Sequence, residues 1–465
     1  MLCIFPERRP RCCSLATVNR VFLNDLTSLW KFGPATPPSG KHIGVFTVRI
    51  AAVSISSFCT GLTLLESAQM QSPNGHKLEQ EIGLLSKQLC GWLRDAAYPV
   101  WSEAGFNSNT GAFYESINLA TGSADREPVR TRVPARQIYC FTLAGDFGWK
   151  GDTRAIVELG LDWYLKHCWK DGRVATSAVE LDGTHQDSTF DLYNQAFAFL
   201  GLAYAGEALP ERRAEFRERT ENLLTILKNT YAHPLAGFRE SGADQLPLRS
   251  NPHMHLFEAA LALEAFGAGE NWTALADEIA NLALDKFIDP VSGGLREFFD
   301  MDWSPMPTDQ GRIMEPGHQF EWCWLLLRWS KLRGNADGEH KARRLYEIGM
   351  THGIDPDRDA AIMALNDDFT PRDRLVRLWS QTEWLKAAVA LARISVGAER
   401  DIYLEHVLRS GQRLKTFFQE VPSGLWRDKL DETNTFKIEP APASSFYHIV
   451  CAISELSYLA RDFPK

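Results

Sequence analysis

From about residue 77 onward, apolar residues recur with the spacing of amphipathic helices. About twelve such segments can be distinguished, and they alternate in character. Six carry their charged residues on one face, as helices with one side in water do, and the other six are apolar almost all round, which is typical of helices enclosed on both sides. The first group covers about 79–97, 152–169, 211–230, 271–287, 338–352 and 399–418, and the second about 132–146, 187–206, 251–267, 313–333, 376–396 and 443–462.

Short glycine-containing stretches separate these segments at intervals near sixty residues, the length of two helices with their loops. They are Gly111-Ala-Phe-Tyr-Glu115, Gly172-Arg-Val174, Gly237-Phe-Arg-Glu240, Gly294-Leu-Arg-Glu297, the region from Gly353 to Leu365, and Gly424-Leu-Trp-Arg-Asp428. The pattern predicts an all-α fold in which six helix pairs close into an (α/α)6 barrel of six inner and six outer helices. An open helical array is the alternative, because helix pairs can also stack without closing.

The first 75 residues differ from the rest of the chain. They begin basic and rich in cysteine and proline, and the apolar stretch 43–65 is interrupted by Arg49 and many hydroxyl residues, so it is a poor membrane span. We interpret residues 1–75 as a dispensable N-terminal extension, with a transit-type leader as the alternative. Residues 76–465 are then the barrel and the catalytic domain.

The amino-acid composition limits which kinds of partner and which cellular compartment we expect. Of 465 residues, 50 are Lys or Arg and 59 are Asp or Glu, which gives 50 − 59 = −9 and no basic stripe for a nucleic acid to follow. Nine cysteines without a CxxC pair indicate thiols in a reducing compartment rather than disulfides or structural zinc, so we expect a cytoplasmic protein. We expect no nucleic-acid or membrane partner, and leave a homodimer open.

Polar residues embedded in the six enclosed segments are the candidates for chemistry. A buried polar group without a partner costs about 1–3 kcal/mol, so such a set is expected to line a cavity at one barrel mouth. Each enclosed segment supplies at least one: Arg136, Tyr193, Asn194, His253, His255, Glu258, His318, Glu321, Gln381, Glu383 and His448.

Two histidine–glutamate pairs, at positions 255/258 and 318/321, have the i, i+3 spacing that puts both side chains on one helix face. A nearby carboxylate can orient an imidazole and adjust its pKa for acid–base work. Pro316-Gly317 predicts that His318 lies in the first helical turn, at the rim. Each pair could also be a satisfied core histidine, but two pairs with His448 favour a site.

Cofactor and metal chemistry find little support in the sequence. The motifs GxGxxG, GxxxxGK[ST] and GxSxG are missing, as is HExxH. His253 and His255 are two residues apart, so on a helix their imidazoles point about 200° apart. We therefore expect no metal and no cofactor.

The motifs along the chain resemble those of the N-acylglucosamine 2-epimerase superfamily, in the right order from about residue 80 to the C-terminus. They are Val133-Pro-Ala-Arg136-Gln, Asp191-Leu-Tyr-Asn194-Gln, Asn251-Pro-His-Met-His255-Leu-Phe-Glu258, Glu315-Pro-Gly-His318-Gln-Phe-Glu321-Trp, Trp379-Ser-Gln381-Thr-Glu383 and Ser445-Phe-Tyr-His448. The fourth and the last of these motifs, with His318 and His448, look most like the mannose isomerase branch, often labelled mannose-6-phosphate isomerase-like. The family fold is an (α/α)6 barrel.

This resemblance implies a sugar isomerase that interconverts an aldose, mannose or mannose 6-phosphate, and its ketose through a cis-enediol without a metal. It implies that His318 moves the proton between C2 and C1 while His448 opens the ring. Arg136, Asn194, Asn251, His255, Glu258, Glu321, Trp379 and Gln381 would hold sugar hydroxyls, and Tyr193 and Glu383 join them as substrate-binding candidates from their place in the enclosed segments.

Several readings stay open at this level. A 2-epimerase acting on N-acylglucosamine or a reducing-end glucose unit would share nearly all of these residues. A glycoside hydrolase on the same barrel would use carboxylates such as Glu321 and Glu383. A sugar-binding barrel without turnover is the last alternative. The arginines 130, 132, 136, 296 and 312 are candidate phosphate ligands, but their spacing does not bring them together.

Overall fold

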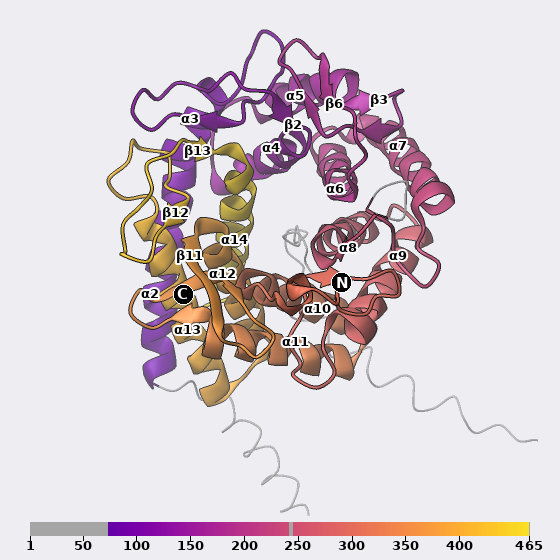
Figure 1. The fold of residues 1–465 in the computed structure, drawn as a ribbon. Coiled ribbons are helices and arrows are strands. Elements are labelled where there is room, and N and C mark those ends of the chain that lie inside the picture. The colour runs from indigo at the N-terminus through magenta and orange to yellow at the C-terminus, as the bar shows by residue number, and fades with distance from the viewer. Residues whose placement is uncertain (1–72, 241–244, 465) are drawn as a thin grey trace, which may run out of the picture. The chain divides into compact units, whose positions relative to one another are not determined.

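The computed structural model describes residues 73–240 and 245–464. In that part of the chain, twelve long helices form a closed ring of two layers (Figure 1). The inner layer consists of α4 (Arg132–Leu143), α6 (Leu192–Ala208), α8 (Ser250–Ala265), α10 (Pro316–Arg333), α12 (Leu378–Ile394) and α14 (Ala443–Arg461). The outer layer consists of α2 (Pro73–Trp92), α5 (Thr153–His167), α7 (Arg213–Ile226), α9 (Glu270–Leu282), α11 (Ala336–Ile348) and α13 (Gly397–Thr416), and the short α3 (Tyr98–Glu103) follows α2.

The inner helices pack in sequence order around the ring, and α14 packs against α4 to close it. Each outer helix packs against the inner helices beside it, with α2 between α13 and α14. The predicted (α/α)6 barrel is therefore confirmed, and the open array is not formed. All six inner segments and all six outer segments were placed correctly to within a few residues, apart from the later start predicted for α2 and the earlier start predicted for α6.

The inner and outer helices differ in sequence because they differ in how many of their faces are buried. Along α6 nearly every side chain is buried, and the Asp191 carboxylate caps the helix by accepting a hydrogen bond from the Tyr193 amide. At Gly201 an added Cβ would lie 3.0 Å from Ala135, so glycine permits the close approach of α6 to α4. The outer α11 instead leaves its charged residues exposed or partly exposed, and it is capped by the Asn335 side chain.

Short helical turns extend several of these helices. Four outer helices, α2, α7, α9 and α11, continue into π-helical turns, which are Leu93–Ala97, Leu227–Tyr231, Ala283–Phe287 and Gly349–Gly353. The first of these turns is followed by α3. Single 3-10 turns cover Ala144–Phe147, Pro210–Arg212 and Asp309–Arg312. The recurrence of the π turn at the ends of outer helices is a structural sign of the repeat that the sequence only suggested.

Small antiparallel sheets, which the all-α prediction did not include, join the helix pairs. The largest has the order β12-β11-β10-β9 and the others have two or three strands. The strands are β1 (Ser116–Ile117), β2 (Val129–Arg130), β3 (Trp169–Lys170), β4 (Val174–Ala175), β5 (Ala178–Val179), β6 (His185–Asp187), β7 (Leu248–Arg249), β8 (Phe298–Phe299), β9 (Ile354–Asp355), β10 (Ala360–Leu365), β11 (Pro371–Arg377), β12 (Lys429–Leu430) and β13 (Ala441–Pro442). In register, β10 pairs Ile362 with Val376 of β11.

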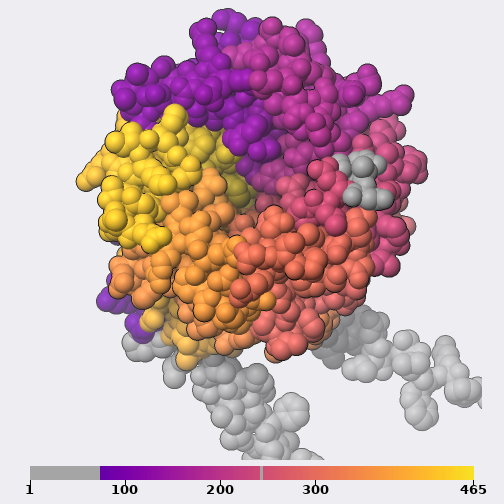
Figure 2. Space-filling model, viewed as in Figure 1, coloured from indigo at the N-terminus to yellow at the C-terminus, as the bar shows by residue number. Residues whose placement is uncertain are grey.

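The strands border one mouth of the barrel, because several of them lead directly into inner helices. Strand β7 ends at Arg249 and α8 begins at Ser250; β11 leads in the same way into α12, and β13 into α14. The first turns of the inner helices therefore gather at this mouth. Figure 2 shows a hollow near the centre of the same face.

The predicted extension, residues 1–75, lies outside the described residues except for 73–75, which begin α2. Within residues 73–240 and 245–464, none of the helices has both the length and the apolar character needed to cross a bilayer.

Candidate functional site

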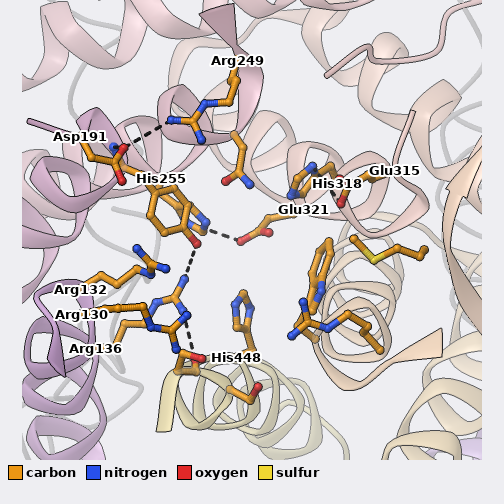
Figure 3. Close-up of a pocket in the computed structure, with 17 residues that line it drawn as sticks. Arg130, Arg132, Arg136, Asp191, Arg249, His255, Glu315, His318, Glu321 and His448 are labelled. Carbon is orange, nitrogen blue, oxygen red and sulfur yellow. Dashed lines mark hydrogen bonds and ion pairs between the residues drawn. The ribbon is translucent and has the colours of Figure 1, made fainter. Parts of the chain in front are cut away.

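A polar cavity of about 380 Å³ opens at the first turns of the inner helices (Figure 3). Its volume is in the range of small-molecule sites. All six inner helices line it, through Arg132 and Arg136 of α4, Tyr193 of α6, Asn251 and His255 of α8, His318 and Glu321 of α10, Trp379 of α12, and Ser444, Ser445 and His448 of α14. The segments just outside these helices contribute Arg130, Asp191, Arg249, Glu315, Met363 and Arg377.

Trp379 lies between the two predicted catalytic histidines. Its ring centroid is 5.1 Å from that of His318 and 6.0 Å from that of His448. An added Cβ at Gly317 would clash with this indole, so the glycine before His318 lets α10 begin directly against it. His318 is the third residue of α10, which confirms its predicted place in the first turn. The two imidazoles therefore share one cavity.

His318 is held by two carboxylates. Its Nδ1 lies 2.9 Å from Oε2 of Glu297 and 3.7 Å from Oε2 of Glu315. Burial opposes the charged imidazolium, but Glu297 and Glu315 outweigh it and raise the pKa of His318 to about 10. His318 is therefore a cation at neutral pH, and it can donate a hydrogen bond or a proton to a ligand oxygen.

The second carboxyl of this cluster, Glu315, also titrates unusually. Burial and the neighbouring Glu297 raise its pKa to about 7, although His318 works in the opposite direction. The Glu315 side chain lines the cavity beside His318 (Figure 3). A carboxyl with a pKa near neutrality can both give and take a proton at working pH.

His448 has the opposite charge state. Burial, followed by the cations Arg136 and Lys386, lowers its pKa well below the usual value, so the ring is neutral. Its Nδ1 lies 2.8 Å from Oε1 of Glu383. A neutral imidazole facing a carboxylate carries its proton on that nitrogen, which leaves Nε2 with a free lone pair. His448 is therefore prepared to act as a base.

A buried lysine compensates the carboxylates beneath the cavity. Nζ of Lys386 lies 2.5 Å from Oε2 of Glu383 and 3.6 Å from Oε1 of Glu321, and all three side chains are fully buried. The ammonium also sits 4.0 Å from the ring centroid of Trp324. Burial and the neighbouring Glu321 raise the pKa of Glu383 well above its usual value, and Lys386 is the charge that opposes this and favours the ionised carboxylate facing His448.

His255 belongs to a neighbouring buried network. Its Nδ1 lies 3.3 Å from Oε2 of Glu258 and 4.0 Å from Oε1 of Glu321, and the Tyr447 hydroxyl donates to Glu258. Burial lowers the pKa of His255 despite these carboxylates. Glu258 is kept behind the cavity, where it orients the imidazole that faces the ligand space.

Five arginines surround the cavity. Carboxylates outside the cavity hold three of them: Arg130 with Glu115, Arg249 with Glu240, and Arg377 with Asp428. Arg132 and Arg136 come from α4 and project into the cavity (Figure 3). The cavity is thus rich in positive charge on the α4 side.

Most of the predicted site residues meet at this cavity. His318, His448, Arg136, Tyr193, Asn251, His255, Glu321 and Trp379 line it, whereas Asn194, Glu258, Gln381 and Glu383 do not. Asn194 accepts a hydrogen bond from Arg132 at 3.4 Å and donates one to Asp191. Three of the four contact a residue that lines the cavity: Asn194 contacts Arg132, Glu258 contacts His255, and Glu383 contacts His448.

Gln381 is one of the predicted site residues that do not line the cavity, because its side chain holds the backbone instead. Its side-chain amide is fully used by the backbone: Oε1 accepts from the Ala361 amide and Nε2 donates to the Ala361 carbonyl. Two other inner-helix glutamines hold a mouth segment in the same way, so this backbone clamp repeats around the barrel. The clamps are Gln195 on Ala175, Gln319 on Leu295 and Gln381 on Ala361.

His253 occupies in α8 the position that the three glutamines occupy in their own inner helices. Its Nε2 accepts from the Phe238 amide and its Nδ1 faces the Arg249 carbonyl. Burial lowers its pKa to about 4, so the ring is neutral as these contacts require. His253 is thus structural while His255 faces the cavity, as their spacing predicted.

Among the described residues, three groups of side chains could hold a metal ion by distance alone: His255 with Glu258 and Glu321, His318 with Glu297 and Glu315, and His448 with Glu321 and Glu383. Within the first and third groups, Lys386 already supplies a cation next to Glu321 and Glu383. In the second, the His318 imidazolium is itself the cation between two carboxylates. Each of the three groups of carboxylates and histidines therefore already has a positive charge within or beside it that the protein itself provides.

The prediction missed the residues that tune the histidines. Glu297 was noted only as part of a glycine-containing stretch, although Glu115, Glu240, Glu297 and Asp428 end such stretches and all hold a residue at the mouth. This repeated position of an acidic residue at the end of a glycine-containing stretch was the signal that could have identified Glu297. Lys386 gave a second one, because it is a charged residue in the middle of an enclosed helix.

Comparisons with known proteins agree with this geometry. The family model "N-acylglucosamine 2-epimerase (GlcNAc 2-epimerase)" matches residues 111–452. A protein of Rhizobium meliloti (strain 1021) named mannose-6-phosphate isomerase is 51% identical over 378 residues, which are 81% of this chain and 97% of the relative.

Two of the solved structures that share the fold are an isomerase and an epimerase. A D-mannose isomerase superposes with a TM-score of 0.70 at 21% identity, over 79% of this chain and 97% of that one. The cellobiose 2-epimerase of Bacillus thermoamylovorans B4167 superposes with a TM-score of 0.71 at 15% identity, over 81% and 99%. The barrel, its polar mouth and the match over most of the chain lead to one conclusion: the chain belongs to the N-acylglucosamine 2-epimerase family.

Proposed function

We propose that this protein is an isomerase that interconverts an aldohexose of the mannose type, free or 6-phosphorylated, and its ketose through a cis-enediol. The observation that carries the proposal is the opposite charge state of two imidazoles in one cavity. His448 is neutral with a free Nε2, and His318 is an imidazolium. The name of the 51% identical relative supports the substrate class.

The chemistry needs a base and an electrophile at neighbouring atoms. In the open-chain aldose, the C2 hydrogen is acidic only because of the C1 carbonyl, so charge moves to oxygen when the proton leaves. We assign removal of the C2 proton, and its return to C1, to Nε2 of His448. The imidazolium of His318 stabilises the enediolate oxygen by donating a hydrogen bond to it.

The hydroxyl protons must also be moved, because O2 loses one and O1 gains one. Glu315, with a pKa near 7 beside His318, is suited to this exchange. These assignments reverse the division of roles that the resemblance implied, because His318, a cation at neutral pH, is a poor base. Tyr193, Asn251, His255, Glu321 and Trp379 are proposed to hold the remaining sugar oxygens, and Arg136 is proposed to contact the end of the sugar away from C1.

The test is NMR of mannose and mannose 6-phosphate in D2O with chelator-treated protein. We expect the ketose to accumulate and deuterium to enter at the carbon that receives the proton. If neither ketose nor deuterium exchange is seen with either sugar, the proposal is wrong. A requirement for added divalent metal would refute the metal-independent mechanism.

A 2-epimerase is the second candidate. The His318 imidazolium could protonate C2 from its own side of the cavity and return an epimeric aldose instead of a ketose. Chromatography of the products distinguishes the two outcomes. A glycoside hydrolase is less well supported, because Glu321 and Glu383 are both engaged by Lys386 and Glu383 does not reach the cavity.

We propose residues 76–465 as the catalytic domain, because the cavity draws its residues from Arg130 to His448. A cytoplasmic location is proposed from the free thiols of Cys90, Cys140, Cys168, Cys323 and Cys451. We propose no nucleic-acid or membrane partner. Light scattering after gel filtration decides between a monomer and a homodimer.

A further inference from the structure

Two guanidiniums in the cavity lack a balancing carboxylate. Arg130, Arg249 and Arg377 each have an acidic partner outside the cavity, but no ion pair to Arg132 or Arg136 is formed within the described part of the chain. Both come from α4, four residues apart and therefore on one face of that helix. Their positive charge is directed at the ligand space.

Neutral groups hold these two guanidiniums in place. Arg136 donates from Nη2 to the Tyr193 hydroxyl at 2.6 Å and from Nη1 to the Ser444 carbonyl at 3.3 Å. Both guanidiniums face the Tyr193 ring, with Cζ 5.3 Å from the ring centroid for Arg132 and 5.6 Å for Arg136. The site is thus built in advance and does not depend on a flexible side chain finding its ligand.

The arrangement is unfavourable without an anion. Arg136 is only 4% exposed, and its Nε is buried with no hydrogen-bond partner in the described residues. Burial, together with the nearby Arg130 and Arg136, lowers the pKa of Arg132. Buried cations are normally paired, so a pair left uncompensated at a cavity wall points to a ligand that brings negative charge.

We propose that Arg132 and Arg136 bind the phosphate of a hexose 6-phosphate, so that the phosphorylated aldose is the preferred substrate. This inference rests on the proposed isomerase function. A phosphate monoester is close to a dianion at neutral pH and matches two guanidiniums, each of which can donate two parallel hydrogen bonds. Arg130 lies beside them, with its charge balanced by Glu115.

The position of the arginines fits the reaction. In Figure 3, Arg130, Arg132 and Arg136 gather on one side of the cavity, and His318 with Glu315 lies on the opposite side. An open-chain hexose has its reacting C1 and C2 at one end and its phosphate on C6 at the other. With C1 near His318, the chain therefore extends toward α4.

The test compares kcat/KM for mannose 6-phosphate with kcat/KM for mannose at constant ionic strength. We expect the ratio to exceed ten in the native protein and to fall at least tenfold in Arg132→Gln, with a smaller fall in Arg132→Lys. Arg173→Gln is the matched control, since Arg173 is exposed and outside this cavity, and it should leave the ratio unchanged. Inorganic phosphate should inhibit mannose turnover competitively, and less strongly in Arg132→Gln.

A ratio near one in the native protein, or an equal ratio in Arg132→Gln, overturns the phosphate site. The phosphate competition needs only the native protein, so it decides the question even if a variant does not fold. Turnover of mannose without preference or competition refutes this inference alone, whereas absence of turnover on both sugars refutes the proposed isomerase function itself.

Discussion

Replacing Lys386 by methionine tests the charge network beneath the cavity. Methionine keeps a similar unbranched side chain but removes the ammonium that contacts Glu383 and Glu321. Two buried carboxylates then face each other without a cation. Because all three groups are fully buried, solvent does not screen the loss.

The size of the effect follows from this burial. Breaking a buried ion pair by removing one partner costs about 3–5 kcal/mol, a large part of the roughly 5–15 kcal/mol that stabilises a typical folded protein. We therefore expect Lys386→Met to lower the free energy of unfolding by about 3–5 kcal/mol. The pKa of His448 should rise as well, because Lys386 is one of the charges that lower it.

Urea unfolding monitored by circular dichroism and tryptophan fluorescence measures the first effect, and the pH dependence of kcat measures the second. The acid limb of the pH profile should move to higher pH, since His448 acts as a base only when it is neutral. Lys331→Met is the matched control, because Lys331 is exposed on α10. Its stability and pH profile should equal those of the native protein.

The double variant Lys386→Met/Glu383→Gln separates charge from packing. If uncompensated carboxylate charge causes the loss, the double variant is more stable than Lys386→Met, because one of the two charges is gone. A native-like free energy of unfolding in Lys386→Met, with an unmoved acid limb, would refute the network described here.

Three further predictions follow from other parts of the site. His448→Ala and His318→Ala should each lower kcat by about 10²–10⁴-fold with unchanged circular dichroism, and near-native rates in either would remove that residue from the mechanism. The pKa of His318 in the folded protein, about 10, is raised above the ordinary value of 6.5. The contribution of His318 to stability is therefore complete below about pH 6.5 and is lost as the pH rises through 10. Urea unfolding midpoints measured from pH 6 to 10 should fall more steeply in the native protein than in His318→Gln. Gln381→Leu should lower the free energy of unfolding by about 1–3 kcal/mol, because it leaves both backbone groups of Ala361 unpaired, and a variant that lost only substrate affinity would show that Gln381 binds the sugar instead.

The barrel could be predicted because helix periodicity and burial vary together along this chain. The sheets could not, since β10 reads Ala-Ala-Ile-Met-Ala-Leu, a short apolar run without the alternation that distinguishes a strand from a buried helix. Its partner β11 is polar at its exposed start. Pairing between such segments is decided by tertiary contacts that no local pattern records.

The site could be predicted at the level of which helices contribute, but less well at the level of which atoms are free. Gln381 and Tyr193 looked alike as polar residues in enclosed helices, yet one amide is consumed by the backbone and one hydroxyl faces the cavity. The charge states of His318 and His448 depend on Glu297 and Lys386, which come from other parts of the chain. Sequence spacing could not reveal these partners.

The glutamine clamps have a consequence for how such a barrel diversifies. Each clamp grips main-chain atoms of a mouth segment, at Ala175, Leu295 and Ala361, so it is indifferent to the side chains that the segment displays. Neighbouring loop residues can therefore be exchanged while the histidines keep their positions. One scaffold can in this way present a constant reactive centre to sugars whose far ends differ in size and charge.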